Sequence, residues 1–156
     1  MKTIFTLTLF ITMFSVVANI VDYNCLKKHV SMTQYKSLHE YELNALLNAI
    51  KMVESKNGKY LNGKNGESGP YQMKRIVIDD VNRILGTKIY KYEDAMDEQK
   101  SRDICEFYIT YWAEKAGMKH NIEAMARIWN GGPKGYKKKS TIKYWNKIKE
   151  VLYVND

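Results

Sequence analysis

The sequence has none of the common metal-binding patterns. Its histidines, His29, His39 and His120, are scattered along the chain and form no HExxH motif. The two cysteines, Cys25 and Cys105, are far apart and lack the paired spacing of a zinc site. A glycine-rich phosphate loop and known nucleic-acid-binding motifs are missing as well. We therefore predict no metal, no cofactor and no nucleic acid partner.

Apolar runs are also missing beyond the N-terminus. There, Lys2 precedes an apolar stretch over residues 4–17, and Val16-Val17-Ala18 offers small residues for a signal peptidase. A membrane span needs about 20 apolar residues, so this stretch is short for one. We predict a signal peptide over residues 1–18 and a secreted or periplasmic protein. The alternative is an uncleaved signal that anchors the chain in the membrane.

With so few cysteines, the exported chain can form at most one internal disulfide. An oxidising compartment would allow Cys25 and Cys105 to pair and so tie the N-terminal segment (residues 19–37) to a helix of the core. The alternative is that Cys105 is simply buried on an apolar helix face.

Positive charge is abundant. The chain has 25 Lys and Arg residues against 17 Asp and Glu residues, which gives a net charge of +8. Four of these lysines cluster late in the chain, at Lys134, Lys137, Lys138 and Lys139. This charge favours an anionic partner such as a cell-wall polymer, although a solvated basic surface would look the same.

The hydrophobic pattern predicts a mainly α fold with one domain over residues 38–156. Leu43, Leu47, Ile50 and Glu54 share one face of the first helix, and Asn121 can cap a later helix that turns Trp129 inward. A glycine-rich loop covers residues 59–69, and Lys88–Tyr92 is expected to be extended. The other expected helices cover Lys74–Leu85, Asp97–Ala116 and Thr141–Leu152, and the first covers Leu38–Ser55.

Glu54 is an unusual residue for the apolar side of a helix. A carboxylate in line with Leu47 and Ile50 is partly desolvated, and at the C-terminal end of a helix it faces the negative end of the dipole. Both effects favour the protonated form, so we predict a raised pKa. A general acid that cleaves a glycosidic bond needs such a pKa. The alternative is a glutamate that frays into solvent.

Four short stretches occur in an order typical of one enzyme family. They are VES at the end of the first helix, GESGPYQM after the glycine loop, ARIWNGGPKG and TIKYW. In this order they resemble the soluble lytic transglycosylases and their goose-type lysozyme relatives of the lysozyme-like superfamily. The resemblance extends from about Leu38 to Val151, and it implies that the chain binds peptidoglycan glycan strands. We expect a monomer without a specific protein partner.

The resemblance assigns roles to individual residues. It implies that Glu54 is the catalytic acid and base and that Ser55 helps to hold this glutamate or the sugar. Gln72, in Gly69-Pro70-Tyr71-Gln72, matches a glutamine that would bind a substrate acetamido group. Tyr71 could stack on a sugar face, although an apolar position is more typical of a core aromatic.

The last two motifs supply the remaining expected site residues. The family's tyrosine-asparagine pair falls on Trp129 and Asn130, and its late tyrosine falls on Tyr144, near the catalytic carboxylate. Trp129 departs from the family pattern, because a tryptophan stands where the family has a tyrosine. The cleft therefore lacks the tyrosine hydroxyl. Trp129 could stack on a sugar face, although an aromatic residue on an apolar stripe is more often part of the core. Packing alone would also explain Tyr144, and Asn130 could mark an ordinary helix end.

Glu67 is the second departure, since many transglycosylases have a small residue there. A hydrolase needs a second carboxylate to activate water, whereas a lytic transglycosylase needs only one because the muramic 6-hydroxyl attacks internally. Asp79 and Asp80 are further carboxylates, but we expect them to be solvated. The motif order favours a lytic transglycosylase that cleaves the β-1,4 bond between N-acetylmuramic acid and N-acetylglucosamine. A lysozyme that uses Glu67 and a non-catalytic wall-binding module are the alternatives.

Overall fold

The computed structural model describes residue 34 and residues 37–153. The predicted signal peptide (1–18), almost all of the predicted N-terminal segment (19–37) and Cys25 lie outside these residues. The cleavage site and the Cys25–Cys105 bridge therefore stay predictions, although Cys105 is fully buried. No helix in the described part of the chain is long and apolar enough to cross a membrane.

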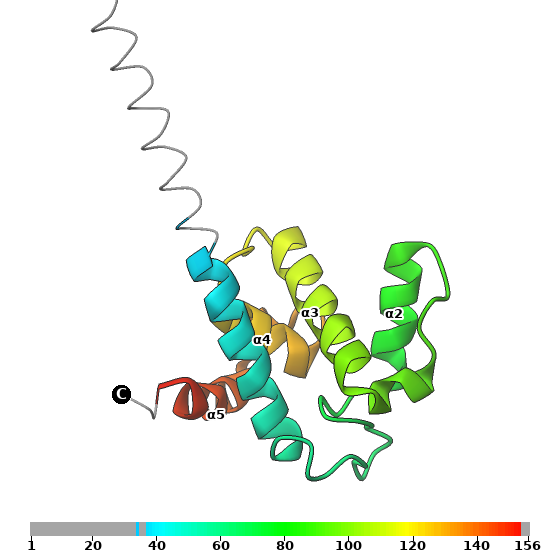
Figure 1. The fold of residues 1–156 in the computed structure, drawn as a ribbon. Coiled ribbons are helices and arrows are strands. Elements are labelled where there is room, and N and C mark those ends of the chain that lie inside the picture. The colour runs from blue at the N-terminus through cyan, green and yellow to red at the C-terminus, as the bar shows by residue number, and fades with distance from the viewer. Residues whose placement is uncertain (1–33, 35–36, 154–156) are drawn as a thin grey trace, which may run out of the picture. The chain divides into compact units, whose positions relative to one another are not determined.

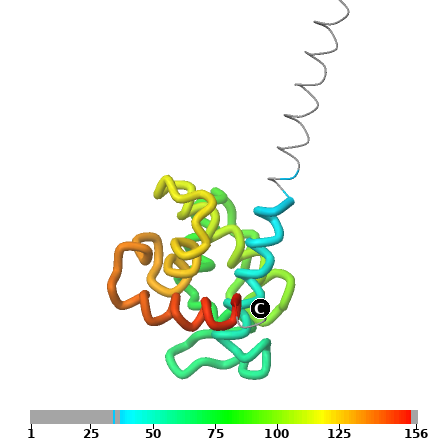
Figure 2. The backbone as a smooth tube through the Cα atoms, turned by 90° about the vertical axis from the view of Figure 1, so that its left-hand side faces the viewer, coloured from blue at the N-terminus to red at the C-terminus, as the bar shows by residue number. Residues whose placement is uncertain are grey.

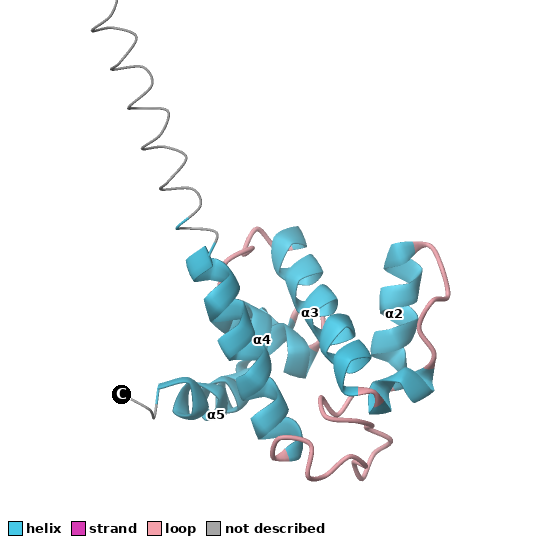
Figure 3. Ribbon diagram, in the orientation of Figure 1, coloured by secondary structure: helices cyan, strands magenta, loops and turns pink. Residues whose placement is uncertain are grey.

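Helices dominate the described chain, which confirms the predicted mainly α fold (Figure 3). A first helix covers residues 37–55. Of the four α-helices that follow, α2, α3 and α5 begin and end within about one residue of the predicted bounds, and α4 begins directly after the expected cap Asn121. With three short 3-10 helices, the elements in chain order are α2 (Arg75–Leu85), η1 (Tyr92–Met96), α3 (Glu98–Lys115), α4 (Ile122–Gly131), η2 (Gly135–Lys137), η3 (Lys139–Thr141) and α5 (Ile142–Tyr153).

Local capping explains these bounds. The side chain of Asp97 accepts a hydrogen bond from the Lys100 N–H at the start of α3, and Asn121 accepts one from the Ala124 N–H at the start of α4. Residues 88–91 lie outside any helix, and Lys91 has the extended backbone expected for this stretch (φ −104°, ψ 163°), whereas Tyr92 already begins η1.

The core lies inside the compact unit Tyr41–Asp156, where α3 packs against both α2 and α4, and α5 packs against α4 (Figure 1). Its largest fully buried aliphatic side chains come from all of these helices. They include Leu46, Leu47 and Ile50 of the first helix, Ile78 of α2, Ile104 and Ile109 of α3, Met125 and Ile128 of α4 and Ile148 of α5. This core fixes the ends of the helices from which functional side chains project.

The loop of residues 56–74 connects the first helix to α2 and lies at one end of the helical unit (Figure 2). Two isolated bridges, Asn62 with Ser68 and Ser68 with Met73, hold it together. Gly69 has φ of +78°, and a Cβ there would lie 1.6 Å from the Ala95 carbonyl oxygen. Only glycine allows this close approach to η1, so the loop has a defined position beside the helices.

Candidate active site

A cavity of about 270 Å³ brings together five of the predicted site residues. They come from three separate segments of the chain: the first helix, the loop of residues 56–74 and α4. The five are Glu54, Glu67, Gln72, Trp129 and Asn130. Residues distant in sequence thus meet around one carboxyl group, as an enzyme cleft requires.

Glu54 occupies the last turn of the first helix and is only partly exposed. Burial raises its pKa to about 7, and the negative charge of Glu67 adds to this rise. Hydrogen bonds from the side chains of Tyr144 and Trp129 oppose it, as does the charge of Lys147. The predicted rise in pKa is confirmed, and desolvation is its main cause. Glu54 can therefore hold a proton near neutral pH.

Tyr144 of α5 makes the direct contact with this carboxyl group. Its hydroxyl donates a hydrogen bond of 2.8 Å to Glu54 Oε1. The Tyr144 side chain is buried, and both this burial and the neighbouring Glu54 raise its own pKa well above the ordinary tyrosine value. Tyr144 thus stays a neutral donor that fixes the orientation of Glu54.

Glu67 lies on the loop side of the same cavity, in the opposite electrostatic environment. Its Oε2 accepts a hydrogen bond of 2.9 Å from the Asn65 N–H, and its Oε1 lies 3.3 Å from Lys74 Nζ. The Asn65 N–H and the cation of Lys74 lower the pKa of Glu67, with burial as the opposing influence. One carboxyl of the cavity therefore favours the acid form and the other favours the carboxylate.

Gly63 allows two polar side chains to approach the loop backbone. A Cβ at this position would lie 2.4 Å from Glu67 Oε2 and 2.6 Å from Gln72 Oε1. The Gly63 N–H also donates a hydrogen bond of 2.8 Å to the Glu67 carbonyl. A side chain at residue 63 would have to displace at least one of the two polar groups.

Gln72 has φ of +49°, an uncommon conformation for a residue other than glycine. Its Nε2 donates to the carbonyl oxygens of Tyr60 (3.1 Å) and Gly69 (2.9 Å). Because carbonyl oxygens only accept, these two bonds fix which end of the amide is nitrogen. Both amide protons are used, so Oε1 is the atom that could accept a bond from a substrate N–H.

The aromatic residues divide between the cavity and the core. Trp129 lines the cavity but is only 9% exposed, and its ring meets Tyr71 and Tyr108 edge to face. Tyr71 is 1% exposed, with its hydroxyl 3.4 Å from an Arg102 nitrogen. The expectation that Tyr71 stacks on a sugar is therefore corrected: its ring packs against Trp129 inside the core. Asn130, by contrast, is exposed.

Ser55 is buried and bonded within the backbone of its own turn. Its hydroxyl donates to the Lys51 carbonyl at 3.0 Å and accepts from the Gly58 N–H at 2.7 Å. Ser55 therefore cannot contact a sugar, and this part of the expectation is wrong. Its two bonds hold the helix end from which Glu54 projects, which agrees with the expectation that Ser55 helps to hold the glutamate.

Sequence reasoning missed several residues of the cavity. Lys74 and Tyr108 line it without any motif that marks them, and Gly63 is one of several glycines in its loop. The expectation for Asp80 is also corrected, since this carboxylate is partly buried and bonds both Arg83 and the Trp112 indole N–H. Within the described residues, no group of three or more His, Cys, Asp or Glu side chains could hold a metal ion.

Comparisons with known proteins find a likeness to lysozymes. No family model and no solved structure matches the chain. The chain is 33% identical over 93 residues to a lysozyme of Ostrea edulis, a match that covers 59% of this chain and 65% of that protein. It is 46% identical over 44 residues to a lysozyme of Meretrix lusoria, across 28% of this chain and 36% of that protein. The matches thus span less than two thirds of these relatives, and the chain is similar to lysozymes over that part of their length.

Proposed function

We propose that this chain is a peptidoglycan glycosidase that cleaves the β-1,4 bond between N-acetylmuramic acid and N-acetylglucosamine. The observation that carries the proposal is the pair of carboxyl groups in one cavity, with the pKa of Glu54 raised to about 7 and that of Glu67 lowered. Similarity to proteins named lysozyme supports the choice of substrate.

Glu54 acts as the general acid in this reaction. Its protonated carboxyl lies at the cavity and donates its proton to the glycosidic oxygen as the bond to the leaving sugar breaks. The Tyr144 hydroxyl holds the carboxyl in place, and after proton transfer the bonds from Tyr144 and Trp129 stabilise the carboxylate. A positioned acid of this kind contributes about 10² to 10⁴ in rate.

Glu67 acts as the base that orients and activates a water molecule. Its environment keeps it ionised at neutral pH, where Glu54 keeps its proton, and such opposed pKa values separate the acid and base roles. The Asn65 N–H and Lys74 hold the carboxylate, and Gly63 leaves room for it. This arrangement supports hydrolysis, the activity of a lysozyme.

Lytic transglycosylation is the second candidate. The carboxylate of Glu67 already bonds the loop backbone and Lys74, as a purely structural loop residue would. In that case Glu54 protonates the leaving oxygen and then accepts the proton of the muramic 6-hydroxyl, which closes a 1,6-anhydro ring. The motif order of the sequence favours this reaction, whereas the opposed pKa values favour hydrolysis.

The substrate contacts and the location of the protein belong to the same proposal. Gln72 Oε1 accepts a bond from an N-acetyl N–H, and the exposed Asn130 contacts the sugar from the α4 side of the cavity. The protein acts after export, and its basic loop (Lys134 and Lys137–Lys139), which is exposed, meets anionic wall polymers.

Mass spectrometry of peptidoglycan digested by the purified protein tests the proposal. Reducing-end muropeptides are the expected products, since they require attack by water. Products that carry 1,6-anhydromuramic acid would show that the reaction is transglycosylation and not hydrolysis. Intact glycan strands after prolonged incubation with folded protein would contradict both and leave a non-catalytic wall-binding module.

A further inference from the structure

Three tyrosines of the described chain are buried, and one of them differs from the other two. The hydroxyl of Tyr144 donates to Glu54 at 2.8 Å, and that of Tyr71 accepts from an Arg102 nitrogen at 3.4 Å. The hydroxyl of Tyr108 has no hydrogen-bond partner among the described residues, although Tyr108 is only 5% exposed. A buried tyrosine hydroxyl usually has a partner. Phenylalanine would fill the same space, so packing alone does not account for the Tyr108 hydroxyl.

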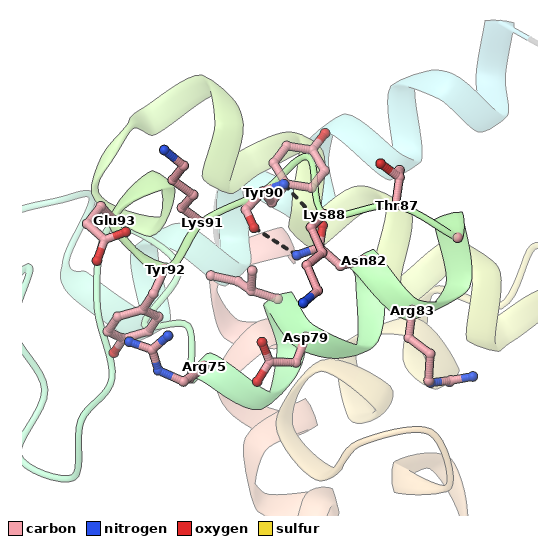
Figure 4. A pocket seen from close by; sticks show the side chains of 12 residues that line it. Arg75, Asp79, Asn82, Arg83, Thr87, Lys88, Tyr90, Lys91, Tyr92 and Glu93 are labelled. Carbon is pink, nitrogen blue, oxygen red and sulfur yellow. Dashed lines mark hydrogen bonds between the residues drawn. The ribbon is translucent and has the colours of Figure 1, made fainter.

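Asn82 shows the usual arrangement of a buried polar side chain beside a cavity. It lines a cavity of about 740 Å³ between α2 and residues 86–93 (Figure 4). Its amide donates to the Tyr90 carbonyl at 2.7 Å and accepts from the Tyr90 N–H at 3.0 Å. These bonds join two segments of the chain, so the amide of Asn82 has a structural role that the Tyr108 hydroxyl lacks.

The Tyr108 oxygen is open to solvent. Within the described residues, every buried side-chain oxygen or nitrogen has a hydrogen-bond partner, so an oxygen without a partner must be accessible. A Cβ at Gly132 would lie 4.0 Å from the Tyr108 oxygen, and because glycine has no side chain, nothing at this position covers it. Tyr108 and Gly132 both line the Glu54 cavity, and both also line a second cavity of about 450 Å³ together with Asp80. The hydroxyl is therefore the accessible part of a buried ring in the wall of the Glu54 cavity.

The surroundings of Tyr108 keep it neutral and fixed. Burial and, after it, the negative charge of Asp80 raise the pKa of Tyr108 to about 12, so the hydroxyl keeps its proton at neutral pH. The ring meets the Trp129 ring edge to face, with 6.1 Å between the two centroids. Tyr108 thus presents a donor in a defined position before any ligand binds, and a fixed donor loses less entropy on binding than a mobile one.

We propose that the Tyr108 hydroxyl donates a hydrogen bond to an acceptor oxygen of the glycan in the Glu54 cavity. This contact rests on the proposed function, which brings a glycan into that cavity. Gln72 Oε1 offers an acceptor to the same ligand, and Tyr108 adds a donor from α3. A polar group that is left unpaired in a complex lowers affinity, so Tyr108 selects ligands that carry an oxygen at this place.

Tyr108 binds the glycan and takes no part in proton transfer. Besides burial, the groups that shift the pKa of Glu54 are Tyr144, Trp129, Glu67 and Lys147. Loss of the Tyr108 hydroxyl should therefore act through substrate affinity and leave the pH dependence of the reaction unchanged.

Calorimetry in a Glu54→Gln background tests binding without cleavage. The ligand is a peptide-free tetrasaccharide of alternating N-acetylglucosamine and N-acetylmuramic acid. The double variant Glu54→Gln/Tyr108→Phe should bind it about threefold to tenfold more weakly than Glu54→Gln, the usual effect of one neutral hydrogen bond. The control Glu54→Gln/Tyr111→Phe removes a hydroxyl from the same helix, at a residue that lines neither of the two cavities, and should bind like Glu54→Gln.

Stability and kinetics separate a substrate contact from a structural role. Because the Tyr108 hydroxyl has no partner in the described protein, Tyr108→Phe breaks no internal hydrogen bond and should keep the wild-type denaturation midpoint. In the otherwise wild-type enzyme it should raise KM on peptidoglycan by the same threefold to tenfold and leave kcat and the pH–rate profile unchanged. A lower denaturation midpoint, or a displaced alkaline limb of the profile, would assign Tyr108 to the structure and overturn the contact.

Failure of this contact differs from failure of the proposed function. If Glu54→Gln binds the tetrasaccharide equally well with and without Tyr108→Phe, only the Tyr108 contact is rejected. If Glu54→Gln does not bind the tetrasaccharide and the wild type does not cleave peptidoglycan, the contact and the proposed function are both rejected.

Discussion

The cavity has two walls that differ in construction. The helical wall consists of the end of the first helix with residues of α2, α3 and α4. Behind this wall, the buried rings of Trp129 and of Tyr144 from α5 lie next to Glu54. The loop wall, residues 56–74, presents Glu67 to a backbone N–H and to Lys74. Packing in the first wall raises a pKa, and polar contacts in the second lower one. The difference shows how one cavity can provide an acid and a base at the same pH.

The helical wall provides the largest expected effect. Glu54→Gln keeps the shape of the side chain and removes its proton. Wall-lytic activity should therefore fall by about 10³-fold or more, because the variant loses the general acid and also the base that this acid becomes after it has given up its proton. Turbidity of a peptidoglycan suspension measures this loss. Near wild-type lysis by this variant would reject Glu54.

A folding control accompanies this variant. In the wild type, the pKa of Glu54 is about 4.5 in the unfolded chain and about 7 in the folded protein. As pH rises from about 4.5 to 7, only the unfolded state ionises, so the wild type loses stability over this range. The glutamine of the variant does not titrate, and the variant should be up to about 3 kcal/mol more stable than the wild type above pH 7. Denaturant unfolding at about pH 5 and pH 8, on either side of the folded pKa, measures the difference.

The loop wall should give the next largest effect. Glu67→Gln removes the proposed base and should lower the rate of hydrolysis about 10²-fold. Release of reducing ends from peptidoglycan, followed at constant pH, measures the change. Activity close to that of the wild type, together with anhydro products, would assign Glu67 to the structure of the loop and the reaction to transglycosylation.

Gly63 tests whether the loop wall depends on close backbone approach. In Gly63→Ala the new methyl group would meet Glu67 Oε2 and Gln72 Oε1, so activity should fall about tenfold, through both kcat and KM, as two substrate-side groups move. The control Gly117→Ala adds a methyl group where no atom lies within 4 Å. It should lose some stability because of its φ of +73° but keep its activity. Equal activities of the two variants would contradict the role of Gly63.

Tyr144 should give the smallest effect on rate and an informative effect on pH dependence. Its hydrogen bond lowers the pKa of Glu54, so Tyr144→Phe should raise this pKa further. The loss of activity at alkaline pH, which follows ionisation of the acid, should then move to higher pH. A pH–rate profile of kcat/KM measures the shift. An unchanged or lower alkaline limb would show that Tyr144 does not tune Glu54.

The sequence predicts the helical wall better than the loop wall. The spacing of Leu47, Ile50 and Glu54 indicates both the helix and the buried side of the carboxyl, because helical periodicity is a local property. Asn121 and Gly86 mark helix ends for similar local reasons. The mainly α fold follows from these patterns.

Long-range contacts explain what the sequence does not predict. Nothing local indicates that Lys74 pairs with Glu67, that Gly63 leaves room for Gln72, or that Asp80 accepts a bond from Trp112. The burial of Tyr71 is equally hard to predict from the sequence, because its ring is buried by packing against Trp129 and so lies outside the cleft. Motifs therefore identify which residues gather at the cavity, but not which of them remain accessible.

The proposed mechanism depends most directly on the protonation of Glu54 at neutral pH. Carbon-13 NMR of the side-chain carboxyls in selectively labelled protein follows the titration of both Glu54 and Glu67, with Glu54→Gln and Glu67→Gln to assign the two signals. We expect a midpoint of about 7 for Glu54 and a midpoint below the ordinary value of 4.5 for Glu67. A Glu54 signal that titrates at or below 4.5 would contradict the central claim that the helical wall keeps this carboxyl as an acid.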